Sequence, residues 1–148
     1  VDAIQIFESH SNSMDYYLSE LYMLNTIKNI TKELKKRHSK IPIIFFSKTI
    51  NYISNKEFFS NIDCVSLGSN YKMKDLINLI PKEICFQGNL DPMKLMVGGS
   101  QMIDDAKKII GDMRNKNFIF NLGHGVLQHT PVRNVEILIE EIKKSKSN

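Results

Sequence analysis

The longest apolar run in the 148-residue chain is IPIIFF, residues 41–46. Four further runs rich in Ile, Val and Phe lie at residues 3–7, 63–67, 83–86 and 118–122. None of the five alternates cleanly between apolar and polar residues, which is typical of parallel strands covered on both faces. The sequence therefore predicts five buried parallel strands.

Helices are expected between these strands. Pro81 is expected to end one helix, and Thr130 to cap the last helix with Pro131 at its first position. The weakest pattern lies between residues 47 and 62, where a short helix over residues 55–60 is expected. Apolar residues recur at helical spacing over residues 23–34, 73–80, 102–113 and 132–142.

The order of a strand followed by a helix, repeated five times, implies parallel strands with right-handed crossovers. An open doubly wound sheet is one solution, but no Gly-x-Gly-x-x-Gly follows the first run. A barrel needs eight units, and five units of about 30 residues make five-eighths of one. The chain also starts at Val1 rather than Met. We therefore expect residues 1–148 to form a single α/β domain, the C-terminal five βα units of a (β/α)8 barrel whose N-terminal three βα units are absent.

Charge and composition exclude several classes of partner. Twenty Lys and Arg residues against 16 Asp and Glu give a formal charge of +4, which permits an anionic ligand but falls short of a nucleic-acid footprint. The apolar runs are far shorter than the roughly 20 residues that span a bilayer. No secretory leader pattern is present, and Cys64 and Cys85 sit singly among apolar residues. We expect a cytoplasmic protein with no nucleic-acid or membrane partner.

Two strand ends carry candidate ligand-binding residues, because ligands of parallel α/β folds bind where the strands end. His124 lies between Gly123 and Gly125, so backbone can approach a ligand while the imidazole projects into the barrel mouth. A histidine satisfied within the fold is the alternative. Ser9 shares a strand face with Phe7, which suits a ring with polar substituents. A core Phe and a hydroxyl bonded to backbone are the alternative.

The sequence leaves alternative roles for other segments that follow the strands. Residues 87–92, QGNLDP, are expected to form a tight turn, either near a ligand or stabilised by its own side chains. Lys48 could contact an anion, form a Schiff base or be a surface lysine. The sequence holds no His-x-Cys, Cys-x-x-Cys or His-Glu-x-x-His, so no metal site is expected.

Taken together, these motifs resemble the uroporphyrinogen decarboxylase family. They are IQIFES at residues 4–9, IPIIF at residues 41–45 with Lys48 behind it, QGNLDP at residues 87–92 and FNLGHG at residues 120–125. Thr130-Pro131 and Asn134-Val135 follow at the expected distance. Their order and spacing match over nearly the whole chain.

The resemblance implies a (β/α)8 barrel, usually a homodimer, that converts uroporphyrinogen III to coproporphyrinogen III in haem biosynthesis by removing four acetate carboxyls. It implies no metal and no organic cofactor, because a protonated pyrrole ring serves as the electron sink. Carried over by position, Ser9 hydrogen-bonds a substrate carboxylate, Phe7 lines the ring cleft and His124 meets a side-chain carboxylate.

The chain also departs from that family. The family's arginine-rich segment, its aspartate at the pyrrole nitrogens and its active-site tyrosine belong to three preceding βα units, so no residue here is assigned a catalytic role. Gly68-Ser69 stands where the family usually has Asp-Trp, and Thr49 follows Lys48 where Gly or Asp-Gly is usual. We expect this chain alone to lack decarboxylase activity.

Two alternatives remain open. Corrinoid-dependent methyltransferases share the fold, but bind zinc through a His-x-Cys at the place that FFS, residues 45–47, holds here. A degenerate, non-catalytic barrel fragment is the second alternative, and Gly68-Ser69 favours it.

Overall fold

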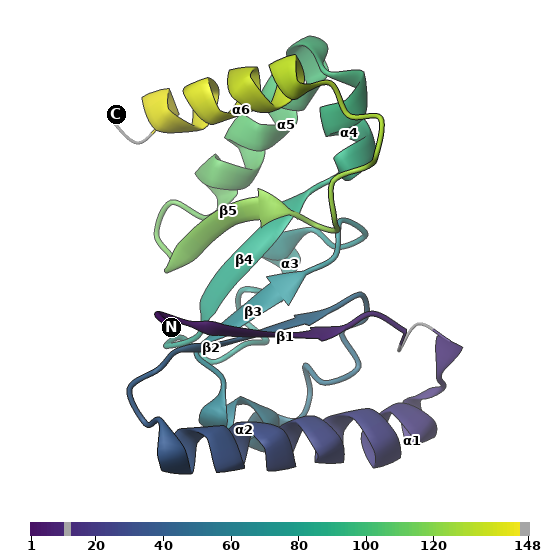
Figure 1. Ribbon diagram of the computed structural model, residues 1–148, viewed down its shortest axis with the longest axis vertical. Helices are drawn as coiled ribbons and strands as arrows, with labels where there is room; N and C mark the ends of the chain where they lie inside the picture. The colour runs from purple at the N-terminus through teal and green to yellow at the C-terminus, as the bar shows by residue number, and fades with distance from the viewer. Residues whose placement is uncertain (11–12, 146–148) are drawn as a thin grey trace.

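The sheet of the protein is singly wound. The computed structural model describes residues 1–10 and 13–145, and its strands form one parallel sheet in the order β1-β2-β3-β4-β5 (Figure 1). Strands that follow one another in sequence are therefore neighbours throughout, as in a barrel, whereas a doubly wound sheet reverses direction. The strands are β1 (Ile4–Glu8), β2 (Ile43–Ser47), β3 (Cys64–Leu67), β4 (Cys85–Leu90) and β5 (Phe118–Leu122).

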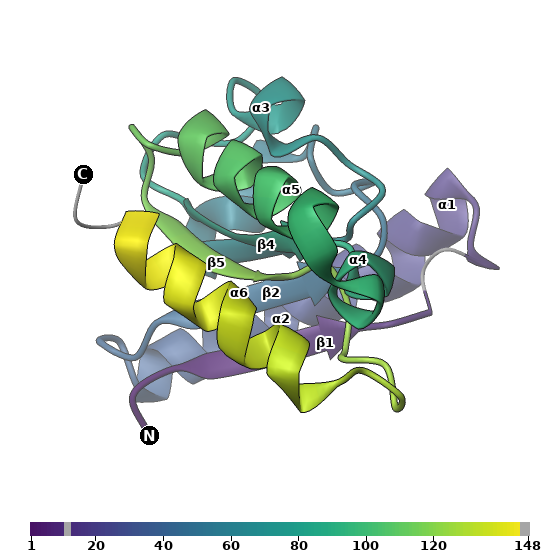
Figure 2. The same cartoon turned by 90° about the horizontal axis from the view of Figure 1, so that it is seen from above.

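Helices cover the sheet at both of its ends. Seen from above, α4, α5 and α6 lie over β4 and β5, and α2 lies beyond β2 (Figure 2). In the described part of the chain no helix has the length and apolar character needed to span a bilayer. The helices are α1 (Tyr16–Leu18), η2 (Ser19–Leu24), α2 (Asn25–Arg37), η3 (Lys56–Asn61), α3 (Met73–Leu76), α4 (Pro92–Val97), α5 (Gly99–Asp112) and α6 (Val132–Ser145).

Successive residues of the strands alternate between the face that packs against the helices and the opposite face of the sheet. Phe45 is fully buried, with its ring centroid 5.3 Å from that of Tyr52 and 5.1 Å from that of Phe58. Its strand neighbour Phe46 lines an open groove on the other face. A second core cluster joins β4 and β5 to α4, α5 and α6 through side chains such as Leu95. One face of the sheet is thus packed against helices, and the other face carries the groove.

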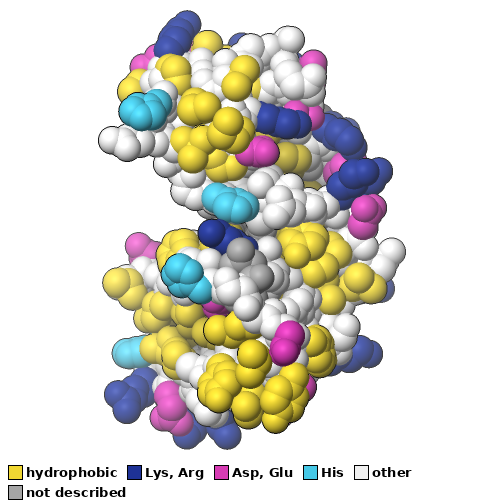
Figure 3. All heavy atoms as spheres, turned by 90° about the vertical axis from the view of Figure 1, so that its right-hand side faces the viewer, with side chains coloured by type: hydrophobic (Ala, Val, Ile, Leu, Met, Phe, Trp, Pro, Cys, Tyr) yellow, Lys and Arg dark blue, Asp and Glu magenta, His cyan; other side chains and the backbone are white. Residues whose placement is uncertain are grey.

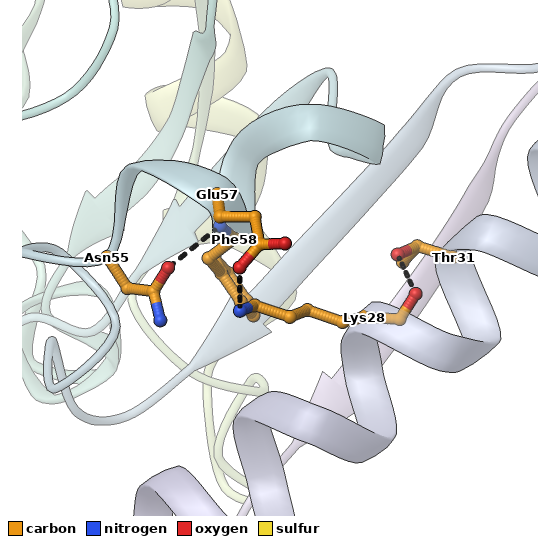
Figure 4. A network of polar contacts seen from close by, with 5 residues as sticks. All are labelled: Lys28, Thr31, Asn55, Glu57 and Phe58. Atoms are coloured by element: carbon orange, nitrogen blue, oxygen red, sulfur yellow. Dashed lines mark hydrogen bonds and ion pairs between the residues drawn. The ribbon is translucent and has the colours of Figure 1, made fainter.

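The weakly patterned link after β2 contains the predicted short helix. A 3₁₀ helix runs over Lys56–Asn61, where a helix over residues 55–60 was expected. Oδ1 of Asn55 accepts a hydrogen bond from the backbone N–H of Phe58 at 3.2 Å and so caps this helix. Nζ of Lys28 on α2 lies 2.8 Å from a carboxylate oxygen of Glu57 (Figure 4). The ion pair joins η3 to the long helix beside it.

Residues 87–90 belong to β4, so the prediction of a turn over QGNLDP was wrong for its first four residues. The polar side chains of this strand are hydrogen-bonded: Gln87 bonds to β1 and β3, and Asn89 bonds to the loop behind β3. The turn is confined to Asp91, whose Oδ1 accepts from the N–H of Met93 at 2.8 Å and so starts α4.

Two helix boundaries also differ from the predictions. Oγ1 of Thr130 is buried and has no hydrogen-bond partner among the described residues, so its predicted capping role was wrong. The N–H of Thr130 donates instead to the carbonyl of Leu127 at 3.0 Å, which places Thr130 in a turn ahead of α6. The helix expected over residues 73–80 is α3 alone, Met73–Leu76, followed by turns up to Pro81.

Candidate ligand-binding groove

An open groove of about 540 Å³ lies on the inner face of the sheet, where the strands end. Figure 3 looks onto this end of the molecule, which is hollowed on one side. Phe7, Ser9 and His124, the three predicted site residues, all line the groove. Segments from opposite edges of the sheet therefore meet at one place, although their role in binding stays a prediction. The other lining residues are Gln5, Phe46, Lys48, Ser66, Asn121, Leu122, Gly125 and Val126.

Aromatic rings form one wall of the groove. Phe7 is 66% exposed, so it is not a core residue. Its ring centroid lies 5.7 Å from that of Phe46, and Phe46 lies 6.4 Å from the imidazole of His124. The ring of Phe7 therefore leaves an apolar surface open at the groove, and its contact with a ligand stays a prediction.

The imidazole of His124 has one buried ring nitrogen, Nδ1, without a hydrogen-bond partner among the described residues. A histidine fully satisfied within the fold, the alternative considered from the sequence, is thus not what the structure contains. Position 123 has no room for a side chain, because the backbone of Ser69 passes close by. A Cβ atom on Gly123 would lie 2.8 Å from Cα of Ser69. The glycine therefore permits the close approach of the segments behind β3 and β5, next to His124.

A polar row beneath the groove was missed by the sequence analysis. Nε2 of Gln87 donates to Oγ of Ser66 at 3.0 Å and to Oε1 of Gln5 at 3.3 Å. These residues come from β4, β3 and β1, and Gln87 and Ser66 are paired in register. The available signal was a polar residue at an inward position of each otherwise apolar strand.

Asn89 supports the site from behind. Its side chain is 6% exposed, and Nδ2 donates to the carbonyl oxygens of Gly68 at 2.9 Å and Tyr71 at 2.6 Å. A place near a ligand was one of two alternatives for residues 87–92. Asn89 instead holds the loop behind β3 and does not line the groove.

The thiols lie at the other end of the strands. Cys64 and Cys85 open β3 and β4 and are paired in register. The interaction with Cys85 and burial raise the pKa of the Cys64 thiol. The described residues contain no group of three or more His, Cys, Asp or Glu side chains that could hold a metal ion.

Comparison with known proteins assigns the chain to a family. The family model for uroporphyrinogen decarboxylase matches residues 1–145. The chain belongs to the uroporphyrinogen decarboxylase family. The resemblance inferred from its motifs is thereby confirmed.

Members of the uroporphyrinogen decarboxylase family match nearly the whole chain but extend beyond it. The uroporphyrinogen decarboxylase of Orientia tsutsugamushi (strain Boryong) is 33% identical over an alignment of 149 residues, which covers 99% of this chain and 43% of that protein. That of Wolbachia pipientis wMel is 37% identical over 145 residues, 96% of this chain and 42% of that protein. The chain thus spans less than half the length of these relatives.

A solved structure supports the fold. A methyltransferase from Methanosarcina mazei superimposes with a TM-score of 0.77 at 15% sequence identity, covering 97% of this chain and 42% of that one. At this identity the likeness bears on the fold alone. Consecutive parallel strands and membership of the uroporphyrinogen decarboxylase family confirm the predicted barrel-type fold class of five βα units.

Proposed function

We propose that the complete protein carrying these residues converts uroporphyrinogen III to coproporphyrinogen III in haem biosynthesis. The observation that supports this most is the groove, which combines the exposed ring of Phe7, the hydroxyl of Ser9 and the imidazole of His124. Family membership favours the same substrate. A macrocycle with carboxylate side chains needs such a pairing of apolar and hydrogen-bonding surface.

Each residue has a defined part in this proposal. The ring of Phe7 packs against the pyrroles, the hydroxyl of Ser9 donates to a substrate carboxylate and His124 holds another carboxylate. When a pyrrole carbon is protonated, the acetate loses CO2 and the electrons of the broken C–C bond return to the ring. A proton then adds to the resulting exocyclic methylene to give the methyl group, and the ring carbon releases the proton it had taken up. Each acetate thus consumes one proton and releases one CO2. No residue of this chain is assigned as the proton donor, and no cofactor is invoked because the ring accepts the electrons.

The proposal places the remaining barrel units outside these residues. The outer edges of β1 and β5 are unpaired among the described residues, and relatives are more than twice as long. Three further βα units would close the barrel and supply the acid and further cations. Residues 1–148 alone are therefore proposed to be inactive.

A second copy is the proposed macromolecular partner, as is usual in this family. Tyr16, Tyr17 and Tyr22 on α1 and η2 are each more than half exposed, and hydrophobic side chains gather over this end of the molecule (Figure 3). Exposed aromatic patches of this kind are typical of protein interfaces. We propose a homodimer in the cytoplasm, with no nucleic-acid or membrane partner.

The direct test is an assay of the complete protein with uroporphyrinogen III under anaerobic, reducing conditions. Coproporphyrinogen III and CO2 are the expected products, and residues 1–148 alone should give none. A folded complete protein that leaves the substrate unchanged would refute the proposal and favour a degenerate copy. Stoichiometric zinc together with methyl transfer to a corrinoid would favour the methyltransferase alternative instead.

A further inference from the structure

Lys48, which the sequence left open, is the one residue with a permanently charged side chain among those that line the groove in the described part of the chain. No Asp or Glu lines the groove there. The remaining lining residues are apolar, hydroxyl or amide side chains, a glycine and His124. The charge of the lining is therefore positive, which favours an anionic ligand.

In the described part of the chain, no carboxylate forms an ion pair with Lys48. Glu8 is paired in register with Ser47, the residue before Lys48, and accepts a hydrogen bond from its hydroxyl at 3.3 Å. Because successive side chains of a strand point to opposite faces, this carboxylate lies on the face away from the groove.

Gly68 separates Lys48 from His124. A Cβ atom on Gly68 would lie 3.5 Å from Cε1 of His124 and 3.7 Å from Cα of Lys48. Any larger side chain at this position would occupy the space between the two residues. With glycine, the space between the Lys48 backbone and the imidazole stays open. Lys48 and His124 both line the groove, and an ammonium and an imidazole can both donate hydrogen bonds to a carboxylate.

We propose that Lys48 determines specificity for carboxylate-bearing tetrapyrroles by binding one substrate carboxylate beside Gly68, opposite His124. The inference rests on the proposed function of the groove and adds a residue to it. A Schiff base is not required, because the proposed substrate offers carboxylates and no aldehyde or ketone carbon. The lysine therefore acts as a fixed cation rather than as a nucleophile.

The test measures binding of uroporphyrin III, a stable octacarboxylate, to the complete protein by fluorescence quenching. Lys48→Met should weaken binding about tenfold, the cost of losing one charge-assisted hydrogen bond. Lys48→Arg should stay within about threefold, because it keeps the charge. Lys40→Met is the matched control, since Lys40 is exposed, has the same charge and does not line the groove. Circular dichroism spectra establish that each variant is folded.

The outcomes separate this inference from the proposed function. Weakened binding in Lys48→Met alone supports the role of Lys48. Tight binding by both the unsubstituted protein and Lys48→Met overturns the inference and leaves the proposed function standing. Equal weakening in Lys48→Met and Lys40→Met also overturns it, because net charge would then explain the effect. An unsubstituted protein that does not bind uroporphyrin III refutes the proposed function itself.

Discussion

Cε1 of His124 lies 3.5 Å from the position that a Cβ atom on Gly68 would occupy. The side chain at position 68, behind β3, therefore determines which atoms contact the imidazole on that side. Nδ1 of His124 is buried without a partner among the described residues, and the family usually has an aspartate where Gly68 stands. A carboxylate at this position would reach the imidazole.

Gly68→Asp should give Nδ1 of His124 a hydrogen-bond acceptor and fix the imidazole tautomer that carries its proton there. The 15N chemical shift of Nδ1 should move to that of a protonated nitrogen at neutral pH. Gly68→Ala is the control: its Cβ makes ordinary contacts of 3.5 Å and adds no acceptor. Identical Nδ1 shifts in the two variants would contradict the geometry.

Gly123→Ala should destabilise the protein by about 1–3 kcal/mol, the usual cost of overpacking. Its Cβ would lie 2.8 Å from Cα of Ser69 and closer still to the backbone nitrogen of that residue. Gly125→Ala is the matched control, because no atom lies within 4 Å of its Cβ position. Urea unfolding of both variants measures the difference, and equal stabilities would show that Gly123 and Ser69 do not pack together as described.

Asn89→Asp should cost about 2–4 kcal/mol, because two buried carbonyl oxygens lose their donor and face a carboxylate. The amide donates to Gly68 and Tyr71 at 2.9 and 2.6 Å. Asn121→Asp makes the same chemical change at an exposed residue whose Oδ1 only accepts a bond, from the N–H of Leu122. Chemical denaturation should show little change for that variant. A small loss in Asn89→Asp would mean that its side chain is not bonded to the loop.

The ion pair between α4 and α5 predicts a pH dependence. The hydrogen bond from Lys94 lowers the pKa of Asp105, so the pair stabilises the folded state above the ordinary aspartate pKa of about 4. This contribution is lost as the pH falls through the lowered pKa of the folded state. Asp105→Asn should therefore be less stable than the unsubstituted protein near pH 7, by up to about 1 kcal/mol, and equally stable near pH 2. A difference that stays constant between these pH values would count against the pair.

The strands could be predicted because their apolar runs are local. The run at residues 118–122 coincides with β5. The end of β4 could not be predicted in this way, because Gln87 is satisfied by Gln5, a residue 82 positions earlier in the chain. Turn-forming composition misleads wherever such long-range partners exist. The capping role of Thr130 failed for a local reason: its backbone N–H donates to the carbonyl of Leu127 in the turn ahead of α6.

The candidate site followed from one rule, that strand ends of parallel sheets gather at one edge. That rule brought Phe7, Ser9 and His124 together without knowledge of any contact. It could not resolve Lys48, because the absence of a counter-ion among its described neighbours depends on which face each side chain takes. Nor could it reveal that Nδ1 of His124 has no hydrogen-bond partner within residues 1–10 and 13–145, which depends on the packing around Gly68.

The central claim is that the inner groove at the strand ends holds a carboxylate-bearing tetrapyrrole. A crystal structure of the complete protein with uroporphyrin III tests it most directly. We predict carboxylate oxygens within about 3 Å of Oγ of Ser9 and of the imidazole of His124. The outer groove between α5, β5 and α6, which includes Arg114 and Lys116, is the competing place for an anion. A tetrapyrrole bound there, with the strand ends unoccupied, would contradict the claim.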